Sequence, residues 1–112
     1  MKQVILDTSF IMSCVKQRID FFEKISDEGM QILIPEQTID ELMALGSQLA
    51  LDIIGKNKFQ LIKIPGKNTD NAIINFAKEN PQLIIATLDK ALQKKIKNHK
   101  MVIRGSKKIE VI

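Results

Sequence analysis

Acidic residues recur where apolar stretches of this chain give way to polar ones. Asp7 ends the stretch VILD, Asp89 ends IIATLD, Glu41 lies in PEQTIDEL and Asp70 in KNTDNAI. Carboxylates that are brought together repel one another and raise each other's pKa unless a cation lies between them. Oxygen ligands without nearby histidine or cysteine suit a hard cation such as Mg²⁺ or Mn²⁺. If the four acids meet in the fold, they form a candidate divalent-metal site.

Each acid also has a simpler structural explanation. Asp7 and Asp89 are suited to cap the helices that follow them, Asp70 favours a helix N-terminus through the helix dipole, and Glu41 is consistent with a solvent-facing position. These explanations suffice for each residue alone. They do not explain why an acid accompanies each of the four strand-to-helix connections.

The elements that would bring the acids together follow from the alternation of apolar runs and polar turns. The 112 residues, 45% hydrophobic and 27% charged, are typical of one soluble globular domain, here 1–112. We expect helices over 9–25 with a break near 16–18, and then over 35–46, 47–54, 69–80 and 89–98. We expect strands over 2–6, 31–34, 59–64, 83–86 and 101–104, with a short additional strand over 108–112.

Strands that alternate with helices predict an α/β fold, a three-layer α/β/α sandwich with a central, mainly parallel sheet of about five strands. In such a sheet functional groups gather beyond the carboxyl ends of the strands. Asp7 and Asp89 both follow strands directly, and we therefore expect them at the same edge of the sheet.

The sequence also excludes several kinds of site. Cys14 is the only cysteine and His99 the only histidine, so the chain has no intramolecular disulfide, no cysteine cluster and no multi-histidine zinc site. A buried structural thiol is the expected role of Cys14. No apolar run approaches the length that spans a bilayer, so we expect a cytoplasmic protein without a membrane partner.

The acidic motifs, in their order and spacing, resemble those of PIN domains, the small α/β nucleases found in VapC-type toxins and in ribosomal RNA processing factors. Asp7-Thr8-Ser9 resembles the Asp-Thr-Asn/Ser motif after the first strand, and Glu41-Leu42 resembles the helical Glu-Leu. Asp70-Asn71-Ala72-Ile73 resembles Asp-x-Ala-Ile, and the segment from Thr87 to Leu92 resembles Thr-x-Asp-Lys-x-Leu. The ending VIRGSKKIEVI is similar to the closing hairpin of a short archaeal group.

Three positions depart from the family pattern. Leu88 stands where many members have Asn, Asn71 stands where a second Asp is common, and Ser9 replaces the more frequent Asn. None of these changes removes a main acid. Asp40 competes with Glu41, but neighbouring helical residues point about 100° apart and the Glu-Leu match favours Glu41.

The resemblance implies a divalent-metal-dependent endoribonuclease that hydrolyses RNA phosphodiester bonds with Mg²⁺ or Mn²⁺. It implies that Asp7 and Asp89 are the principal metal ligands, and that Glu41 and Asp70 are ligands or orient water. The hydroxyl groups of Thr8, Ser9 and Thr87 are candidates to hold the carboxylates or a phosphate. For Thr8 and Ser9, capping of the following helix is an equally good interpretation.

Positive charge is concentrated at the C-terminus. Residues 90–112 contain eight Lys or Arg and one Glu, whereas residues 1–89 contain nine Lys or Arg and twelve Asp or Glu. This basic segment is equally consistent with a solvated helix followed by a protected edge strand and with contact to a polyanion. The candidate RNA-binding residues are Lys94, Lys95, Lys97, Arg104, Lys107 and Lys108, with Lys100 nearby.

The family resemblance favours single-stranded or unpaired RNA as the substrate. It also implies partners of two kinds, an antitoxin or a ribosome-assembly factor, and a homodimer in which the helices with Phe21, Phe22, Leu49 and Ile53 supply either contacts or core. The alternative function is a catalytically silent PIN-like module that binds RNA or protein. Intact acids at all four motif positions argue against it. A haloacid dehalogenase type of phosphatase needs a second Asp where Ser9 stands.

Overall fold

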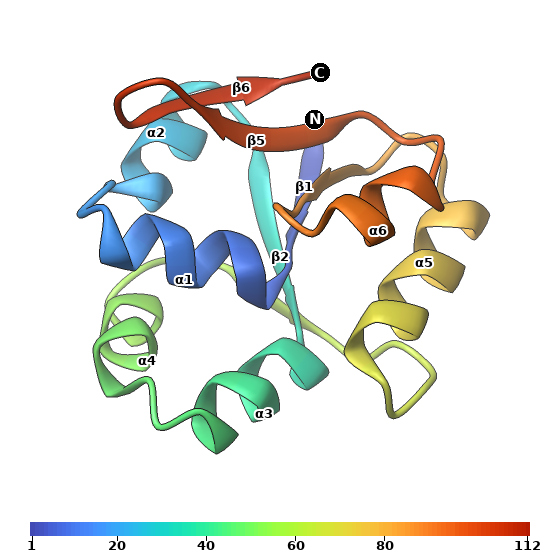
Figure 1. The fold of residues 1–112 in the computed structure, drawn as a ribbon, viewed down its shortest axis with the longest axis horizontal. Helices are drawn as coiled ribbons and strands as arrows, with labels where there is room; N and C mark the ends of the chain where they lie inside the picture. Colours follow the sequence, from blue (N-terminus) through green and yellow to red (C-terminus); the bar gives the residue numbers. More distant parts are fainter.

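The computed structural model describes residues 1–112 and contains one six-stranded sheet (Figure 1). The strand order is β3-β2-β1-β4-β5-β6, and every neighbouring pair is parallel except β5 and β6, which form an antiparallel hairpin. The expected mainly parallel sheet is confirmed, and the additional C-terminal strand is its sixth. The strands are β1 (Gln3–Leu6), β2 (Gln31–Pro35), β3 (Gln60–Ile62), β4 (Ile84–Ala86), β5 (Lys100–Arg104) and β6 (Lys108–Val111).

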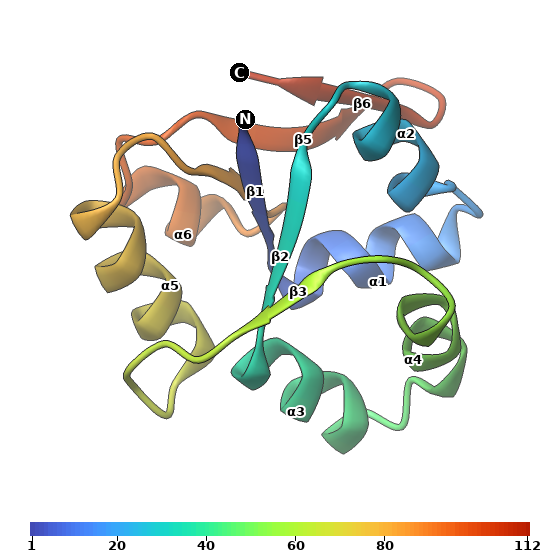
Figure 2. The same ribbon diagram turned by 180° about the vertical axis from the view of Figure 1, so that it is seen from behind.

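Six helices cover the sheet on both sides, as Figures 1 and 2 show from opposite directions. One core lies between α1 to α4 and one face of the sheet, where Val4 and Leu6 point; the second lies between α5, α6 and the other face, where Ile5 points. Alternate residues of β1 are therefore buried on opposite faces, as expected for a central strand of a parallel sheet. The helices are α1 (Thr8–Lys16), α2 (Phe21–Asp27), α3 (Glu36–Ala44), α4 (Gln48–Gly55), α5 (Thr69–Glu79) and α6 (Lys90–Lys94).

The expected break in the first helical segment separates α1 from α2. Arg18 adopts a left-handed conformation with φ of 58°, and Asp20 then caps α2 by accepting a hydrogen bond from the backbone N–H of Glu23 at 3.2 Å. The helix pair buries Phe21 and Phe22 in the core, so neither is available for a dimer contact.

Two elements are shorter than the sequence predicts. Strand β3 spans Gln60–Ile62 because it forms an edge of the sheet and pairs only with β2. Helix α6 ends at Lys94 rather than near Asn98. The buried Asn98 side chain donates to the carbonyl oxygens of Ala77, Asn80 and Leu83, which ties this segment to the end of α5 and takes it out of the helix.

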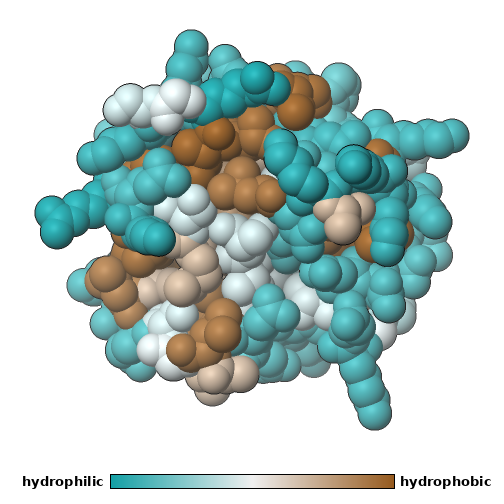
Figure 3. Space-filling view, in the orientation of Figure 1, coloured by the Kyte–Doolittle hydropathy of each residue, from teal (hydrophilic) through white to brown (hydrophobic).

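Several exposed apolar side chains lie on helices α3 and α4 and in the connection between them. The spacing of apolar residues predicts Ile39, Leu42 and Met43 on one inward face of α3, but Met43 is 61% exposed, as are Leu45 and Leu49. Hydrophobic surface is visible over these helices at the lower left of Figure 3. Leu42 lies on the inward face as predicted, with no exposed area. None of the helices is both long and apolar enough to cross a membrane.

The parallel pairing of β1 with β4 sets the geometry of the site. Leu6 pairs with Ala86, and the backbone N–H of Asp7 donates to the Ala86 carbonyl oxygen at 2.9 Å. The next residues of the two strands, Asp7 and Thr87, are thereby placed side by side at the carboxyl edge of the sheet.

Candidate active site

Asp7 lies at the centre of this edge and is only 2% exposed. It occupies the N-cap position of α1, but its side chain makes no capping hydrogen bond, so the simple capping explanation does not apply. Its Oδ2 atom instead accepts hydrogen bonds from Thr87 Oγ1 at 2.8 Å and Ser9 Oγ at 2.9 Å. A buried carboxylate is thus held by two hydroxyl groups from opposite sides of the β1–β4 junction.

Ser9 and Thr87 form a small hydroxyl network around Asp7. Their oxygen atoms are 3.2 Å apart, Ser9 Oγ accepts from the backbone N–H of Leu88, and Thr87 Oγ1 accepts from the backbone N–H of Asp89. Thr8 Oγ1 is buried without a hydrogen-bond partner. The network joins the start of α1 to the start of α6, so the positions of Asp7 and Asp89 are fixed relative to each other.

Replacing Thr87 with Val is expected to lower the free energy of unfolding by about 1.5–3 kcal/mol, because a hydrogen bond to a buried carboxylate is lost. Urea unfolding in chelator at neutral pH measures this change. The matched control is Thr38→Val, since Thr38 is equally buried but donates to the neutral Leu6 carbonyl oxygen. A neutral hydrogen bond contributes about 1 kcal/mol. Equal losses in the two variants would contradict the special role of Thr87.

Asp89 caps a helix with only one of its two carboxylate oxygens. Its Oδ1 atom caps α6 by accepting from the backbone N–H groups of Ala91 at 2.9 Å and Leu92 at 3.2 Å. The expected cap is therefore present. Because both bonds use Oδ1, neither occupies Oδ2.

Glu41 and Asp70 are exposed, but they lie close enough to the other acids for their charges to act on them. Burial, followed by the charges of Asp7, Asp89 and Glu41, raises the pKa of Asp70, while Lys95 lowers it. All four acids contribute to the same electrostatic environment.

The pKa of the buried Asp7 is also affected by a neighbouring acid. Its pKa lies above its ordinary value of 3.8, mainly because of burial, and the charge of Glu41 raises it further. The hydrogen bonds from Thr87, Ser9 and the Thr8 backbone act in the opposite direction. The charge of Glu41 is among the causes that raise the pKa of both Asp7 and Asp70.

Three further side chains, which the sequence motifs did not single out, position the elements that carry the acids. Thr38 donates to the Leu6 carbonyl oxygen and ties α3 to the end of β1; Gln37 donates to the carbonyl oxygens of Ile64 and Gly66 and ties α3 to the loop before α5. Gln93 donates to the Thr87 carbonyl oxygen at 2.7 Å. These contacts have no fixed sequence spacing that would have revealed them.

Gly66 shapes the loop that leads to Asp70. Its φ of +109° is a conformation that side chains rarely adopt, and a Cβ atom there would lie 3.3 Å from the Ala72 side chain. The Asn68 side chain then caps α5 by accepting a hydrogen bond from the backbone N–H of Asn71, which places Asp70 in the first turn.

The candidate RNA-binding residues divide into two groups. Lys94, Lys95 and Lys97 are exposed at the end of α6, whereas Arg104, Lys107 and Lys108 are exposed on the β5–β6 hairpin. Glu110 lies 3.0 Å from Arg104 and 3.9 Å from Lys108.

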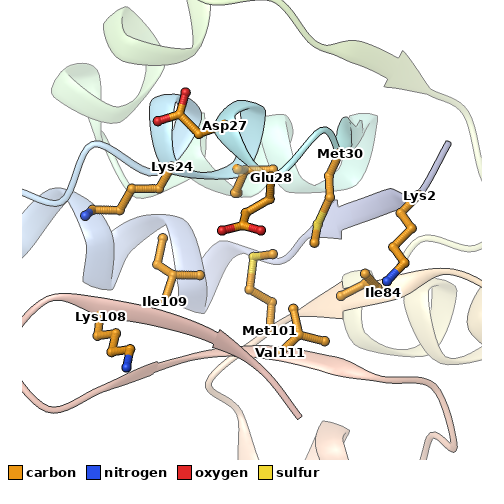
Figure 4. A pocket seen from close by; sticks show the side chains of 11 residues that line it. Lys2, Lys24, Asp27, Glu28, Met30, Ile84, Met101, Lys108, Ile109 and Val111 are labelled. Carbon is orange, nitrogen blue, oxygen red and sulfur yellow. The ribbon is translucent and has the colours of Figure 1, made fainter.

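A cavity of about 520 Å³ lies at the opposite end of the sheet, between α2 and the outer strands (Figure 4). Residues at the amino ends of the strands, such as Lys2 and Ile84, line it together with charges of both signs. None of the four acids lines this cavity.

Cys14 is not connected with the site. It is buried in the core, and burial raises the pKa of its thiol to about 12, which fits the expected structural role.

Comparisons with known proteins point to one family. A family model described as a PIN like domain matches residues 4–105. Ribonuclease VapC4 of Methanocaldococcus jannaschii is 30% identical across 99% of this chain and 97% of its own length. The rRNA-processing protein fcf1 of Schizosaccharomyces pombe is 32% identical across 84% of this chain, which spans about half of that protein (53%).

A solved structure, that of the PIN domain endonuclease Utp24, superposes with a TM-score of 0.85 and 28% identity. The superposition covers 97% of this chain and 90% of the other. The agreement extends over both the β1–β4 junction and the C-terminal hairpin, since it includes nearly every residue. The chain belongs to the PIN-like domain family.

Proposed function

We propose that this protein is a divalent-metal-dependent endoribonuclease that hydrolyses RNA phosphodiester bonds at Asp7, Glu41, Asp70 and Asp89. The observation that carries the proposal is Asp7, a buried carboxylate that does not cap its helix and is influenced by neighbouring acids. Such an arrangement is costly to the fold unless a cation compensates it. The names of the relatives, a ribonuclease, an rRNA-processing protein and an endonuclease, support RNA as the substrate.

The donor atoms fit a hard divalent cation. In this structure no three of the acids lie close enough together to hold one. All four candidate ligands are carboxylates, which suits Mg²⁺ or Mn²⁺. Asp7 and Asp89 are held by the hydroxyl network and the α6 cap, whereas Glu41 and Asp70 are exposed side chains that can rotate towards them. Asp7 and Asp89 would therefore be the fixed ligands, and Glu41 and Asp70 the adjustable ligands or the groups that orient water.

The roles of the surrounding residues follow from their contacts. Ser9 and Thr87 hold Asp7 Oδ2 and thereby fix the direction in which the carboxylate can bind. A bound Mg²⁺ or Mn²⁺ would lower the pKa of water and offset the negative charge that develops on the phosphate during hydrolysis. Nothing in the site has to act as a covalent nucleophile. The buried hydroxyl of Thr8 lacks a hydrogen-bond partner in the protein and is proposed to bind a water molecule.

The partners of the protein are also part of this proposal. The substrate is proposed to be single-stranded or unpaired RNA, the class that the family resemblance favours. The relatives include a VapC ribonuclease and an rRNA-processing protein, so the protein partner would be an antitoxin in the first setting and a ribosome-assembly factor in the second.

A pair of neighbouring acids provides a matched test. Glu41→Gln is expected to lower the rate of RNA cleavage by about 10- to 100-fold or more, as for residues that bind or orient a metal ligand. Asp40→Asn, which removes the same charge one residue away, is expected to retain the rate. The measurement is the initial rate of cleavage of an end-labelled RNA with Mn²⁺. A larger loss in Asp40→Asn than in Glu41→Gln would overturn the assignment of Glu41.

A further inference from the structure

A second surface feature adjoins the acidic edge. A groove of about 360 Å³ lies between α6 and strand β5. Leu88, Lys90 and Gln93 line one wall, and Ile103 and Arg104 belong to the other. Lys90 and Gln93 were not among the residues that the sequence indicated for RNA binding.

The groove is linked to the acidic site by direct contacts. Leu88 and Lys90 flank Asp89 in the chain, and the backbone N–H of Leu88 donates to Ser9 Oγ at 3.0 Å. Ser9 in turn donates to Asp7 Oδ2 at 2.9 Å. One wall of the groove is therefore two hydrogen bonds away from the central carboxylate.

The opposite wall of the groove is formed by strand β5. Strand β5 is parallel to β4, with Met101 opposite Ala86, and Arg104 is its last residue. Arg104 is three positions after Met101, and Asp89 is three positions after Ala86. Arg104 therefore lies past the end of β4 on the neighbouring strand, and it lines the same groove as Leu88 and Lys90, which flank Asp89.

The charge of the groove is complementary to a phosphate backbone. Lys90 and Arg104 are among its lining residues, and none of the lining residues is acidic. The cavity at the other end of the sheet differs in this respect, since Asp27 and Glu28 line it beside its lysines. A polyanion is thus favoured in the groove beside the acids and not in the more distant cavity.

The remaining lining residues are mostly aliphatic. Leu88 and Ile103 are half-buried, and Ile112 is 47% exposed, so they offer apolar surface without an aromatic ring. Such surface can contact bases or riboses but provides no donor or acceptor pattern that distinguishes one base from another.

We propose that the groove between α6 and β5 binds the single-stranded RNA that leads into the acidic site, with Lys90 and Arg104 contacting its phosphates. This inference rests on the proposed function, because the groove is assigned to RNA through its continuity with a phosphodiester-cleaving site. It divides the basic C-terminal segment into Lys90 and Arg104, which contact RNA in the groove, and residues such as Lys107, which lie outside it.

Glu110 modulates this surface. It forms an ion pair with Arg104 at 3.0 Å, in which the Arg104 side chain is 58% exposed. A phosphate therefore competes with Glu110 for the same guanidinium group. Because an exposed ion pair adds little to stability, Glu110→Gln is expected to remain folded and to bind RNA more tightly.

The test measures binding separately from cleavage. Fluorescence anisotropy with an end-labelled oligouridylate, in chelator and in an Asp7→Asn background, gives the affinity without hydrolysis. Lys90→Gln and Arg104→Gln are each expected to weaken binding about fivefold at about 0.1 M salt and to reduce the slope of log affinity against log salt by about 0.7. Lys107→Gln is expected to weaken it less.

Lys58→Gln is the matched control, because Lys58 is exposed before the amino end of β3, at the opposite edge of the sheet, and loses the same charge. Equal affinities of Lys90→Gln, Arg104→Gln and Lys58→Gln would overturn the groove assignment, even if the wild-type protein cleaves RNA. Weaker binding by the two groove variants would support it, even if the wild-type protein cleaves none of the RNA and the proposed activity is wrong. Tighter binding by Glu110→Gln would support the role of Arg104 independently.

Discussion

Asp7→Asn is expected to lower the rate of RNA cleavage by more than about 100-fold, beyond the roughly 10- to 100-fold loss typical of residues that only orient a metal ligand. Asp7 is the buried acid at the centre of the site, and Ser9 and Thr87 hold one of its oxygen atoms in place. Asparagine keeps the shape of the side chain and can still accept these hydrogen bonds, but it removes the charge that a divalent cation needs.

The rate is measured on an end-labelled RNA with Mn²⁺, and Asp40→Asn serves as the control because it makes the same chemical change at an exposed position. A variant that cleaves RNA at the wild-type rate would show that Asp7 is not required. Circular dichroism of both variants would establish that a loss of rate is not a loss of fold.

In chelator, Asp7→Asn is expected to stabilise the folded protein, although it lowers the rate of RNA cleavage. Burial raises the pKa of Asp7 in the folded state above its ordinary value of 3.8. At pH values between 3.8 and the folded-state pKa, the folded state therefore binds more protons than the unfolded state. The stability contributed by this residue is therefore present below pH 3.8 and is lost as the pH rises through the folded-state pKa. At neutral pH Asp7→Asn is expected to melt at a higher temperature than the wild type, and the difference should vanish in acid. A lower melting temperature at neutral pH would contradict this.

Removal of divalent metal is expected to stop cleavage and to lower the stability of the wild-type protein. In the absence of a cation, the charges of Asp7, Asp89 and Glu41 act on Asp70 without compensation beyond Lys95. A ligand that binds only the folded state at 100 times its dissociation constant stabilises that state by about 2.7 kcal/mol. For a domain of this size, this corresponds to a rise in melting temperature of roughly 10 °C.

Cleavage in excess chelator, followed by addition of Mg²⁺ or Mn²⁺, checks the first part of this expectation. Ca²⁺ is a useful comparison, because it also prefers oxygen ligands but takes more of them at longer distances. Undiminished cleavage in chelator would rule out a metal-dependent mechanism.

The sheet and the edge that carries the acids follow directly from the sequence. The runs before Asp7 and Asp89 are short, apolar and rich in β-branched residues, and tertiary packing places them beside each other as β1 and β4. The helix break near Arg18 and the Asn68 cap are also predictable, because they depend on residues close together in the chain.

Most of the features that could not be predicted from the sequence depend on contacts between residues that are far apart in the chain. Helix α6 ends early because Asn98 bonds to carbonyl groups around the end of α5, and Met43 faces solvent because Leu42 fills the core position. The local sequence favours a capping role for Asp7, but its Oδ2 atom instead accepts a hydrogen bond from Thr87, eighty residues away. The motif order predicted the acids, whereas Gln37, Thr38 and Gln93, which position them, have no local pattern.

The most direct test of the metal site is a titration of Mn²⁺ followed by thermal unfolding, with the wild type and Asp7→Asn side by side. We expect the melting temperature of the wild type to rise with Mn²⁺ by roughly 10 °C near saturation, and that of Asp7→Asn to stay nearly constant. Equal rises in the two proteins would show that Mn²⁺ binds elsewhere. No rise in the wild type would contradict the claim that the four acids form a divalent-metal site.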